Sequence, residues 1–438
     1  MSQLTSSQQA AADAFFEFLM KEDMTFVISG GAGTGKTFTM AHLKNTVLKD
    51  YKANCKMIGV PEEYNDVIFT ATTNKAAEVL EKATGEDTKT IHSLLGLKVQ
   101  DDYKTGETYI SATHRTQPIV GKILFIDESS MIDSKLYGFI EELCSTSKVV
   151  FVGDHAQMAP VNEEISPIYL NVDPHNFVFL DKPVRNAGQP ALVDLCAQLR
   201  DTVEKGEFQP MESVPGVIEY LEPHKMEAKV TEYFTEYTDQ AKILCYTNSR
   251  VMAYNDHIRQ MRGKPSHFQQ GDILTVSTAF VQEKKMLGVE REVEVNTIST
   301  EALDGGLEKY TKEFEGPLMY RNITVTARTG SMETLKGRVA ENPNHLKAVL
   351  KALARKKDWQ LYFAVKNAYM DLRDREACTV YKSQGSTYET VFIDIGNIGT
   401  SHDAAQVARM LFVGVSRATT KVYLYGQLPG RYIGRKVA

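Results

Sequence analysis

The stretch TFVISGGAGTGKT, residues 25–37, decides the fold of this 438-residue chain. Its first five residues predict a buried strand, and its last eight match the pattern G-x-x-x-x-G-K-[ST]. A helical pattern follows from about Lys36 to Lys49. A strand, a glycine-rich turn and a helix in this order predict a loop whose backbone N–H groups point at phosphate. The complete motif in this context disfavours the alternative, a glycine-rich turn that binds nothing.

The residue types in this loop suit a nucleotide. Glycines let the backbone approach phosphates closely, Lys36 is expected to reach the β and γ phosphates, and Thr37 is expected to ligate magnesium. The loop residues expected to bind the nucleotide are Gly31, Ala32, Gly33, Thr34, Gly35, Lys36 and Thr37. The sequence therefore predicts a nucleoside triphosphate and Mg²⁺ as ligands.

A pair of carboxylates follows the phosphate loop in the chain. The apolar run Leu124–Ile126 predicts a strand that ends in Asp127 and Glu128. Asp127 is expected to hold the magnesium shell, and Glu128 to position and deprotonate the attacking water. The alternative is a solvated turn after a strand, which the order of the two acids after the loop disfavours.

Three further side chains are candidates for the catalytic machinery. Gln157, in the strand-end sequence VGDHAQ, is a candidate sensor of the γ-phosphate, although such a turn alone is also ordinary loop chemistry. Arg185 and Arg417 are candidates for stabilising charge on the γ-phosphate across a cleft. A surface salt bridge is the more common explanation of either arginine by itself, so their assignment depends on the whole series of motifs.

Strands alternate with helices along most of the chain, which predicts an α/β fold with parallel sheets covered on both faces. The first unit is expected to contain strands 67–71, 122–126 and 148–152. The second is expected to begin near Gly188 and to contain helices 189–205, 249–262 and 403–417 with strands 242–247, 379–381, 391–395 and 421–425. Two segments interrupt this alternation: a polar hairpin at 98–118, and a β-rich stretch at 263–375 that includes a helical run from His345 to Arg373.

The amino-acid composition indicates the cellular environment of the protein more than its reaction. The net charge of −6 argues against a nucleic-acid coat over the whole surface, but a local basic groove remains compatible with it. Five cysteines stand singly, which disfavours zinc and disulfide frameworks and fits a reducing cytosol. No apolar run is long enough to cross a bilayer and the N-terminus lacks a basic signal region, so we expect a cytoplasmic protein without a membrane partner.

The order of these motifs resembles that of superfamily one DNA helicases, in the 5′-to-3′ branch of RecD-like enzymes and small phage Dda-type helicases. The resemblance runs from Gln8 to Gly426. In family terms, the matching segments are Leu4–Gln8 (Q motif), Gly30–Thr37 (I), Phe69–Leu80 (Ia), Thr90–Gly96 (Ib), Asp127–Glu128 (II), Gly153–Gln157 (III), Arg185 (IV), Thr379–Thr387 (V) and Val413–Ala418 (VI). The chain departs from the family pattern at Thr72, Tyr381 and Ser416, where Pro, His and Thr are usual.

The resemblance implies two tandem RecA-like P-loop domains with ATP bound between them. Their expected bounds are 1–97 with 119–187 (domain 1A) and 188–262 with 376–438 (domain 2A). Residues 98–118 would form the 1B hairpin, and residues 263–375 an SH3-like 2B insertion with a helical arm. The implied activity is ATP-dependent translocation 5′ to 3′ on single-stranded DNA with unwinding of duplex, by a monomer, in phage replication or recombination within a bacterial host's cytoplasm. Single-strand-binding or replication proteins are possible partners.

The resemblance also implies binding residues. Gln8 would read adenine, and Gly385 would join the nucleotide site. The expected contacts with DNA are Thr73, Asn74, His92, Tyr246, Asn248, Lys382, Ser383 and Gln384. Tyr103 and Tyr109 could form the tip of a strand-splitting hairpin, although an ordinary exposed hairpin explains the same residues.

Other functions remain open from the residues alone. A P-loop kinase explains Lys36 and Asp127 but not the duplicated α/β unit, and a scaffold with a vestigial loop does not explain why the motif residues are intact. An RNA helicase of the same superfamily is a third alternative, which the sequence excludes poorly. Trp359, the single tryptophan, either stacks on a base or packs inside the arm, and packing is the more common role.

Overall fold

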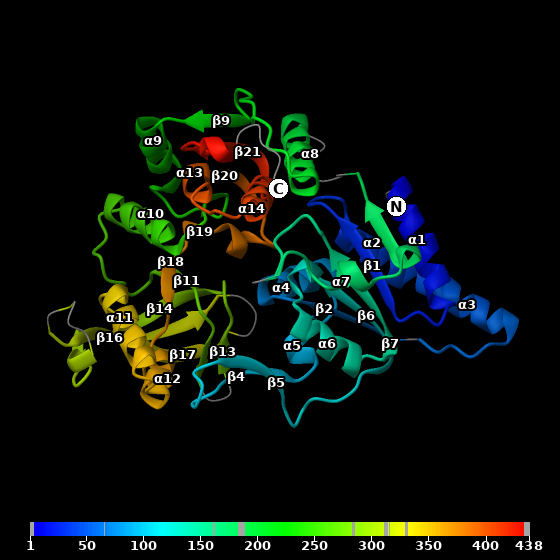
Figure 1. The fold of residues 1–438 in the computed structure, drawn as a ribbon, viewed down its shortest axis with the longest axis horizontal. Coiled ribbons are helices and arrows are strands. Elements are labelled where there is room, and N and C mark those ends of the chain that lie inside the picture. The colour runs from blue at the N-terminus through cyan, green and yellow to red at the C-terminus, as the bar shows by residue number, and fades with distance from the viewer. Residues whose placement is uncertain are drawn as a thin grey trace. The chain divides into compact units, whose positions relative to one another are not determined.

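The computed structural model describes residues 4–64, 66–160, 163–182, 189–282, 285–310, 314, 316–328 and 332–432. The chain forms two compact units (Figure 1). The first contains residues 1–97, 112–251 and 377–438, and the second contains residues 98–111 and 252–376. No helix within the described ranges combines the length and apolarity needed to cross a bilayer.

The first unit contains a six-stranded parallel sheet in the order β3-β2-β6-β7-β1-β8. Its strands are β1 (Thr25–Gly30), β2 (Asp66–Ala71), β3 (Lys89–Thr90), β6 (Val120–Asp127), β7 (Thr146–Gly153) and β8 (Phe177–Leu180). Its helices are α1 (Ser6–Leu19), α2 (Lys36–His42), α3 (Leu48–Ile58), α4 (Asn74–Thr84), α5 (Ile91–Leu94), α6 (Ser134–Leu143) and α7 (Ile168–Asn171). The central strands are buried because helices cover both faces, which explains their continuous apolar runs.

The same unit contains a second parallel sheet, in the order β19-β10-β20-β21-β9. Its strands are β9 (Ile218–Leu221), β10 (Ala241–Cys245), β19 (Ala377–Thr379), β20 (Tyr388–Asp394) and β21 (Ala418–Tyr425). Its helices are α8 (Pro190–Lys205), α9 (Pro223–Phe234), α13 (Ile395–Ile398) and α14 (Ala404–Ser416), while α10 (Asn248–Met261) begins in this unit and belongs to the second unit from Met252 onward. Two parallel α/β sheets in tandem confirm the predicted fold class.

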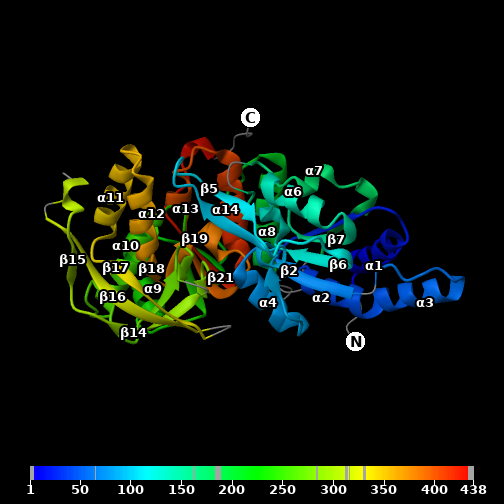
Figure 2. The ribbon, with the colours of Figure 1, turned by 90° about the horizontal axis from the view of Figure 1, so that it is seen from below.

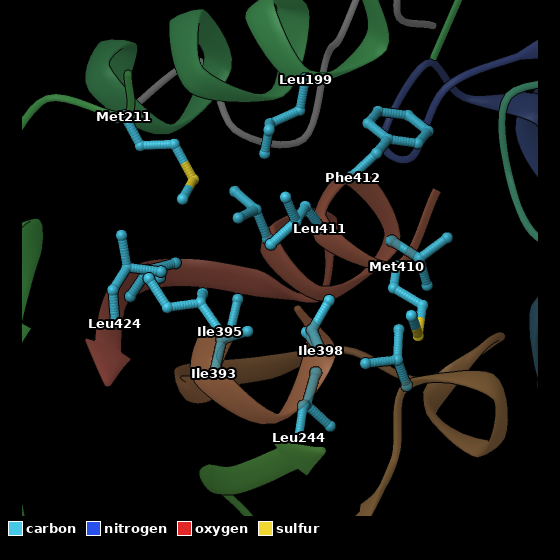
Figure 3. Packing of buried hydrophobic residues seen from close by; sticks show 14 of the residues in the cluster. Leu199, Met211, Leu244, Ile393, Ile395, Ile398, Met410, Leu411, Phe412 and Leu424 are labelled. Carbon is cyan, nitrogen blue, oxygen red and sulfur yellow. The ribbon is translucent and has the colours of Figure 1, made fainter. Parts of the chain in front are cut away.

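A hydrophobic core joins α8 and α14 to the second sheet. Figure 3 shows Leu411 of α14 between Leu199 of α8 and Ile393 of β20. The same cluster includes Ala156 and Met158, which follow β7 of the first sheet. The two sheets therefore share part of one apolar core.

The second unit is built on an antiparallel sheet in the order β15-β16-β14-β11-β18, with β17 paired to β16. Its strands are β11 (Ile273–Val276), β14 (Glu292–Ile298), β15 (Ala302–Asp304), β16 (Leu318–Ala327), β17 (Thr334–Ala340) and β18 (Leu372–Asp374), beside a small hairpin of β12 (Phe280–Gln282) and β13 (Lys285–Leu287). Helices α11 (Pro343–Arg355) and α12 (Trp359–Ala368) lie together on one side of this sheet (Figure 2). Val349 and Leu353 of α11 pack there with Leu318 of β16.

Three element predictions need correction. The helix expected from Lys36 to Lys49 continues to Ile58 through a π-helical segment at Leu43–Val47. The strand expected at 379–381 ends at Thr379, and residues 380–383 form a 3-10 turn. The helical run expected from His345 to Arg373 is two helices followed by β18, because Lys357 adopts φ +55° and the Asp358 side chain caps α12.

A buried network of ion pairs lies in the second unit, where the first and last strands of its sheet meet α10. Arg259 of α10 is 3% exposed, and its guanidinium donates to Asp272 at 2.7 Å and to Asp374 at 3.0 Å. Burial raises the pKa of Asp374 to about 6, and the attraction of Arg259 opposes that rise. Because Asp272 precedes β11 and Asp374 ends β18, this one arginine ties together the start and the end of the inserted sheet.

The predicted hairpin is present and packs against α12. Its strands are β4 (Leu97–Asp101) and β5 (Thr108–Ala112), and the Asp102 carboxylate accepts from the Lys104 backbone N–H in the turn. Gly106 has φ +78°, and a Cβ there would lie 2.5 Å from the Trp359 ring. The Tyr103 and Phe363 rings meet edge to face with centroids 5.1 Å apart. Trp359 therefore packs within the protein, on a turn where only glycine fits.

Candidate nucleotide-binding site

The phosphate loop connects β1 to α2 and requires its glycines. Gly33 and Gly35 have φ +79° and +82°, and a Cβ on Gly30 would lie 2.7 Å from the Thr34 hydroxyl. Lys36 Nζ donates to the carbonyl oxygens of Gly30 at 2.7 Å and Gly31 at 3.1 Å. The ammonium group is thus already held over the loop in which phosphates are expected to bind.

The two acids at the end of β6 have different environments. Burial and the Glu128 charge raise the pKa of Asp127 to about 7, while Lys36 lowers it. Glu128 has φ +52°, a left-handed conformation that non-glycine residues seldom adopt. This turn directs Glu128 away from the strand, and among the described residues its Oε2 has no hydrogen-bond partner.

The loop after β7 contacts residues from the second sheet. Gln157 is 2% exposed, and its Oε1 accepts from Gln384 Nε2 at 3.4 Å. Arg409 of α14 donates to the carbonyl oxygens of His155 and Gln157, both at 2.6 Å. The sequence had not singled out Arg409, because an arginine one residue before an apolar helical run carries no local signal of its partners.

Arg200 of α8 is a second residue that sequence reasoning missed. Its guanidinium lies 2.8 Å from Asp154, which is fully buried, and packs 4.8 Å from the centroid of the Phe179 ring. Burial raises the pKa of Asp154, but Arg200 and then Lys36 bring it below its usual value. Arg200 Nη1 would lie 3.5 Å from a Cβ on Gly31, so this guanidinium stands beside the phosphate loop.

Arg417 caps α14 and is 4% exposed. It donates to the Ser416 hydroxyl at 3.0 Å and to the Ser386 carbonyl at 3.3 Å. Burial lowers its pKa, and the Glu128 carboxylate is the main charge that opposes this. A Cβ on Gly385 would lie 3.8 Å from Glu128 Oε1, which places the turn after β19 beside the same acid. Arg185 lies outside the described residues.

Gln8 is engaged by the protein at both ends of its amide. Its Oε1 accepts from the Thr5 N–H at 3.0 Å, which completes a capping box, and its Nε2 donates to the Thr34 carbonyl at 3.1 Å. Gln8 therefore connects the start of α1 to the phosphate loop. Recognition of adenine by Gln8 stays a prediction. It requires that at least one of these two hydrogen bonds break, so that the freed amide atom can bond to the base.

The expected DNA contacts fall into two groups. The first group has half-buried or exposed side chains at the starts of helices or in turns: Thr73, Asn74, His92, Tyr246, Asn248 and Lys382. Burial lowers the pKa of His92, which favours the neutral ring. In the second group, Ser383 is buried and donates to the Val380 carbonyl at 2.7 Å, and Gln384 bonds to Gln157. Both side chains are engaged in hydrogen bonds within the protein, and their contact with DNA stays a prediction.

The residues around the loop suit a magnesium nucleotide. No cluster of three metal-binding side chains occurs within the described ranges. Mg²⁺ bound with a nucleotide typically takes one or two protein ligands together with phosphate oxygens and water. Thr37 and Asp127 carry the hydroxyl and the carboxylate that the sequence predicts as magnesium ligands, and Asp154 Oδ2, buried without a hydrogen-bond partner among the described residues, would lie 3.9 Å from a Cβ on Gly31 of the loop.

Comparisons with known proteins agree with this geometry. Residues 13–163 match the family described as "AAA domain", and residues 376–425 match the "UvrD-like helicase C-terminal domain". The chain is 22% identical to the ATP-dependent DNA helicase dda of Enterobacteria phage T4, over 96% of this chain and 98% of that protein. It is 28% identical to the RecBCD enzyme subunit RecD of Buchnera aphidicola, over 31% of this chain and 23% of that protein.

A solved structure has the same fold. The Pif1 helicase from Bacteroides, in complex with ADP-AlF3 and ssDNA, superposes with a TM-score of 0.50 at 14% identity, over 99% of this chain and 94% of that one. The ordered motifs, the two matching families and the similarity along nearly the whole chain lead to one assignment. Together they show that the chain is similar to superfamily one helicases of the 5′-to-3′ branch, related to Dda and RecD.

Proposed function

We propose that this protein is an ATP-dependent DNA helicase that moves 5′ to 3′ along single-stranded DNA and separates duplex at forks. One observation carries the proposal: groups from the second sheet lie against the catalytic groups of the first. Gly385 and the charge of Arg417 lie close to Glu128, and Gln384 bonds to Gln157. A nucleotide held by the phosphate loop would therefore meet both halves of the first unit.

The proposed roles follow from position and chemistry. Lys36 binds the β and γ phosphates, and Thr37 with Asp127 holds Mg²⁺. An ion held by these two residues would supply positive charge against the charge that develops on the phosphates. Glu128, turned out of its strand and with an unpartnered oxygen, accepts the proton of the attacking water. Arg417 stabilises charge on the transferred group, and the same role is proposed for Arg185 from its place in the order of motifs.

Asp127 is ready for a cation in this scheme. Its raised pKa reflects burial beside Glu128, so an ionised Asp127 is unfavourable without added positive charge. Binding of Mg²⁺ would hold the carboxylate ionised and remove this destabilisation. The carboxylate pair thus favours the metal-bound form of the site.

For ATP hydrolysis to drive movement along DNA, nucleotide binding must change the arrangement of the two parallel sheets. Arg409 holds the loop of Gln157 through two backbone carbonyls, and Gln384 reaches the Gln157 side chain. A change at the γ-phosphate would thereby reach the turn at 380–383, where Lys382 is a proposed DNA contact. The work comes from the difference in nucleotide affinity between the two arrangements.

The hairpin β4–β5 is proposed as the wedge that separates strands, because it packs on α12 and therefore behaves as a stiff element. Tyr109 is 43% exposed and Tyr103 is 56% exposed, so both rings remain accessible to a base. The bounds of domains 1A, 1B, 2A and 2B, and the SH3-like character of 2B, stay part of the same proposal.

The decisive assay measures ATP hydrolysis with and without single-stranded DNA, then unwinding of duplexes carrying only a 5′ or only a 3′ tail. We expect strong stimulation by DNA and unwinding from the 5′ tail alone. Equal hydrolysis with and without DNA would favour the P-loop kinase alternative. Stimulation by RNA rather than DNA would favour an RNA helicase, and unwinding from the 3′ tail alone would refute the assigned direction.

The cellular setting is part of the proposal. We propose a role in phage DNA replication or recombination, in the cytoplasm of a bacterial host, with single-strand-binding or replication proteins as partners. The protein is expected to act as a monomer, because both halves of the proposed ATP site come from one chain. Sedimentation of the protein with and without DNA tests that expectation.

A further inference from the structure

Helix α11 has two faces of opposite character. His345, Val349 and Leu353 are buried, and the last two pack in a core with Leu318 of β16. The outer face is cationic: between Glu341 and Asp358 the chain has five Lys/Arg and no Asp or Glu. This density is unusual in a chain with a net charge of −6.

Three of these cations form a row, which we call the α11 stripe: Lys347, Lys351 and Arg355. They stand four residues apart, so they share one face of the helix at intervals of about 6 Å. All three are exposed. Lys356 and Lys357 extend the charge past the end of the helix, where Lys356 lies 4.5 Å from the centroid of the Tyr310 ring.

The α11 stripe has no counter-ion within the described part of the chain. None of its three side chains takes part in an ion pair there, whereas Arg321 and Arg338 on the neighbouring strands are each paired with a carboxylate. Unpaired cations in a row repel one another, so the arrangement weakens the isolated helix slightly. Such a surface suits a ligand that brings negative charge at regular intervals.

The absence of aromatic side chains identifies the kind of ligand. Surfaces for single-stranded nucleic acid combine cations with rings on which unpaired bases stack. The exposed face of α11 has no aromatic residue, and the nearest histidine, His345, is buried against Phe314. Cations without stacking groups suit a nucleic acid whose bases are already stacked and whose outer surface is phosphate.

We propose that the α11 stripe is a second nucleic-acid site that binds the phosphate backbone of duplex DNA. The stripe lies in the same unit as the hairpin β4–β5, which packs on α12, the helix that follows α11. The proposal rests on the proposed helicase function, which brings duplex to this unit. The contact is electrostatic, independent of base sequence and separate from the grip on the single strand.

The test compares two double charge reversals of the same size. K347E/K351E alters the α11 stripe, and K49E/K56E alters two exposed lysines of α3 in the first unit as the matched control. Binding of each protein to a blunt duplex without tails is measured by fluorescence anisotropy from about 50 to 200 mM salt. Hydrolysis of ATP stimulated by single-stranded DNA is measured in parallel.

The stripe variant is expected to bind duplex about tenfold more weakly at low salt, with a salt slope smaller by about two. The control is expected to bind like the wild type, and both variants are expected to keep DNA-stimulated hydrolysis. If the wild type lacks that stimulation, the proposed function fails, independently of the stripe. The neutral variant K347Q/K351Q should also bind duplex more weakly than the wild type, but with a smaller loss of affinity. Such a loss would show that the effect does not come only from repulsion between the introduced glutamates and the phosphates.

Three outcomes would overturn the proposal. The first is duplex binding by the stripe variant that equals that of the wild type. The second is a parallel fall of single-strand binding, ATPase stimulation and duplex binding, which would place the stripe on the single-strand path. The third is unchanged duplex binding with loss of binding to a poly-glutamate peptide, which would assign the stripe to an acidic protein segment.

Discussion

Different interactions stabilise the interior of each of the two units. In the first unit, apolar side chains from both sheets form one core, and the polar groups at the strand ends are left partly unsatisfied around the phosphate loop. In the second, the base is closed by a buried arginine with two carboxylates, and the hairpin is held by aromatic rings. The difference is that buried acids beside the phosphate loop of the first unit keep oxygens without hydrogen-bond partners among the described residues, whereas the carboxylates bonded to Arg259 in the second unit are paired within the protein.

Loss of the proposed base should have the largest effect. Glu128→Gln removes the proton acceptor but keeps size and hydrogen bonding, so turnover should fall by about a hundredfold to ten-thousandfold while ATP binding persists. Steady-state hydrolysis and binding of a fluorescent nucleotide measure the two quantities. Glu141→Gln, at an exposed residue of α6, is the control, and a fully active Glu128→Gln protein would show that another group takes the proton.

Breaking the ion network should have the next largest effect, confined to the second unit. Arg259→Met leaves Asp374 buried without its cationic partner, while Asp272 keeps its ion pair with Lys264, and removing one partner of a buried pair destabilises by about 3 to 5 kcal/mol. Trp359 lies in that unit and is the only tryptophan, so its fluorescence during urea unfolding reports on this unit alone. Lys229→Met, which breaks an exposed pair with Glu232, should change the curve little. Unchanged unfolding of Arg259→Met would mean that the network contributes no net stability.

A smaller effect should come from the hairpin contact. Gly106→Ala places a Cβ 2.5 Å from the Trp359 ring and should shift the hairpin off α12. Gly263→Ala is the matched control, because Gly263 also has positive φ (+68°) but has open space around its Cβ position. We expect weaker unwinding and altered Trp359 emission only for Gly106→Ala, with DNA-stimulated hydrolysis retained in both. Equal unwinding by the two variants would remove the hairpin contact from the mechanism.

The smallest expected effect is a change in the pH dependence of stability. The pKa of Asp127 is raised to about 7 in the folded state, so its contribution to stability is fully present below the unfolded value and is lost as pH rises through 7. In EDTA and without nucleotide, Asp127→Asn should therefore melt higher than the wild type at pH 8, and this advantage should shrink towards pH 5.

Partial exposure of Asp127 to solvent limits the expected difference in stability between the two proteins. Asp127 is half-buried and solvent screens it, so we expect about 1 kcal/mol, or about 2 to 4 °C in Tm. Thermal melts at both pH values measure it. A constant difference between the two proteins across this range would show that Asp127 is ionised throughout.

The sequence by itself determined the α/β class, the phosphate loop and the order of the motifs. It could do so because strands, turns and helix starts are local, and a motif such as residues 30–37 needs only its own backbone to form. Local patterns also predicted a hairpin within residues 98–118. They were wrong where tertiary contacts set the ends of elements, as in the helical run that becomes α11, α12 and β18.

Only the tertiary structure decided which distant side chains meet. Arg200 beside Asp154, Arg409 on the loop of Gln157, and Trp359 on Gly106 are contacts between residues far apart in the chain. No local pattern carries them, because an arginine or tryptophan in a helix looks the same whether its partner is water or a buried carboxylate. Packing of whole elements brings these groups together, and burial then sets how strongly they interact.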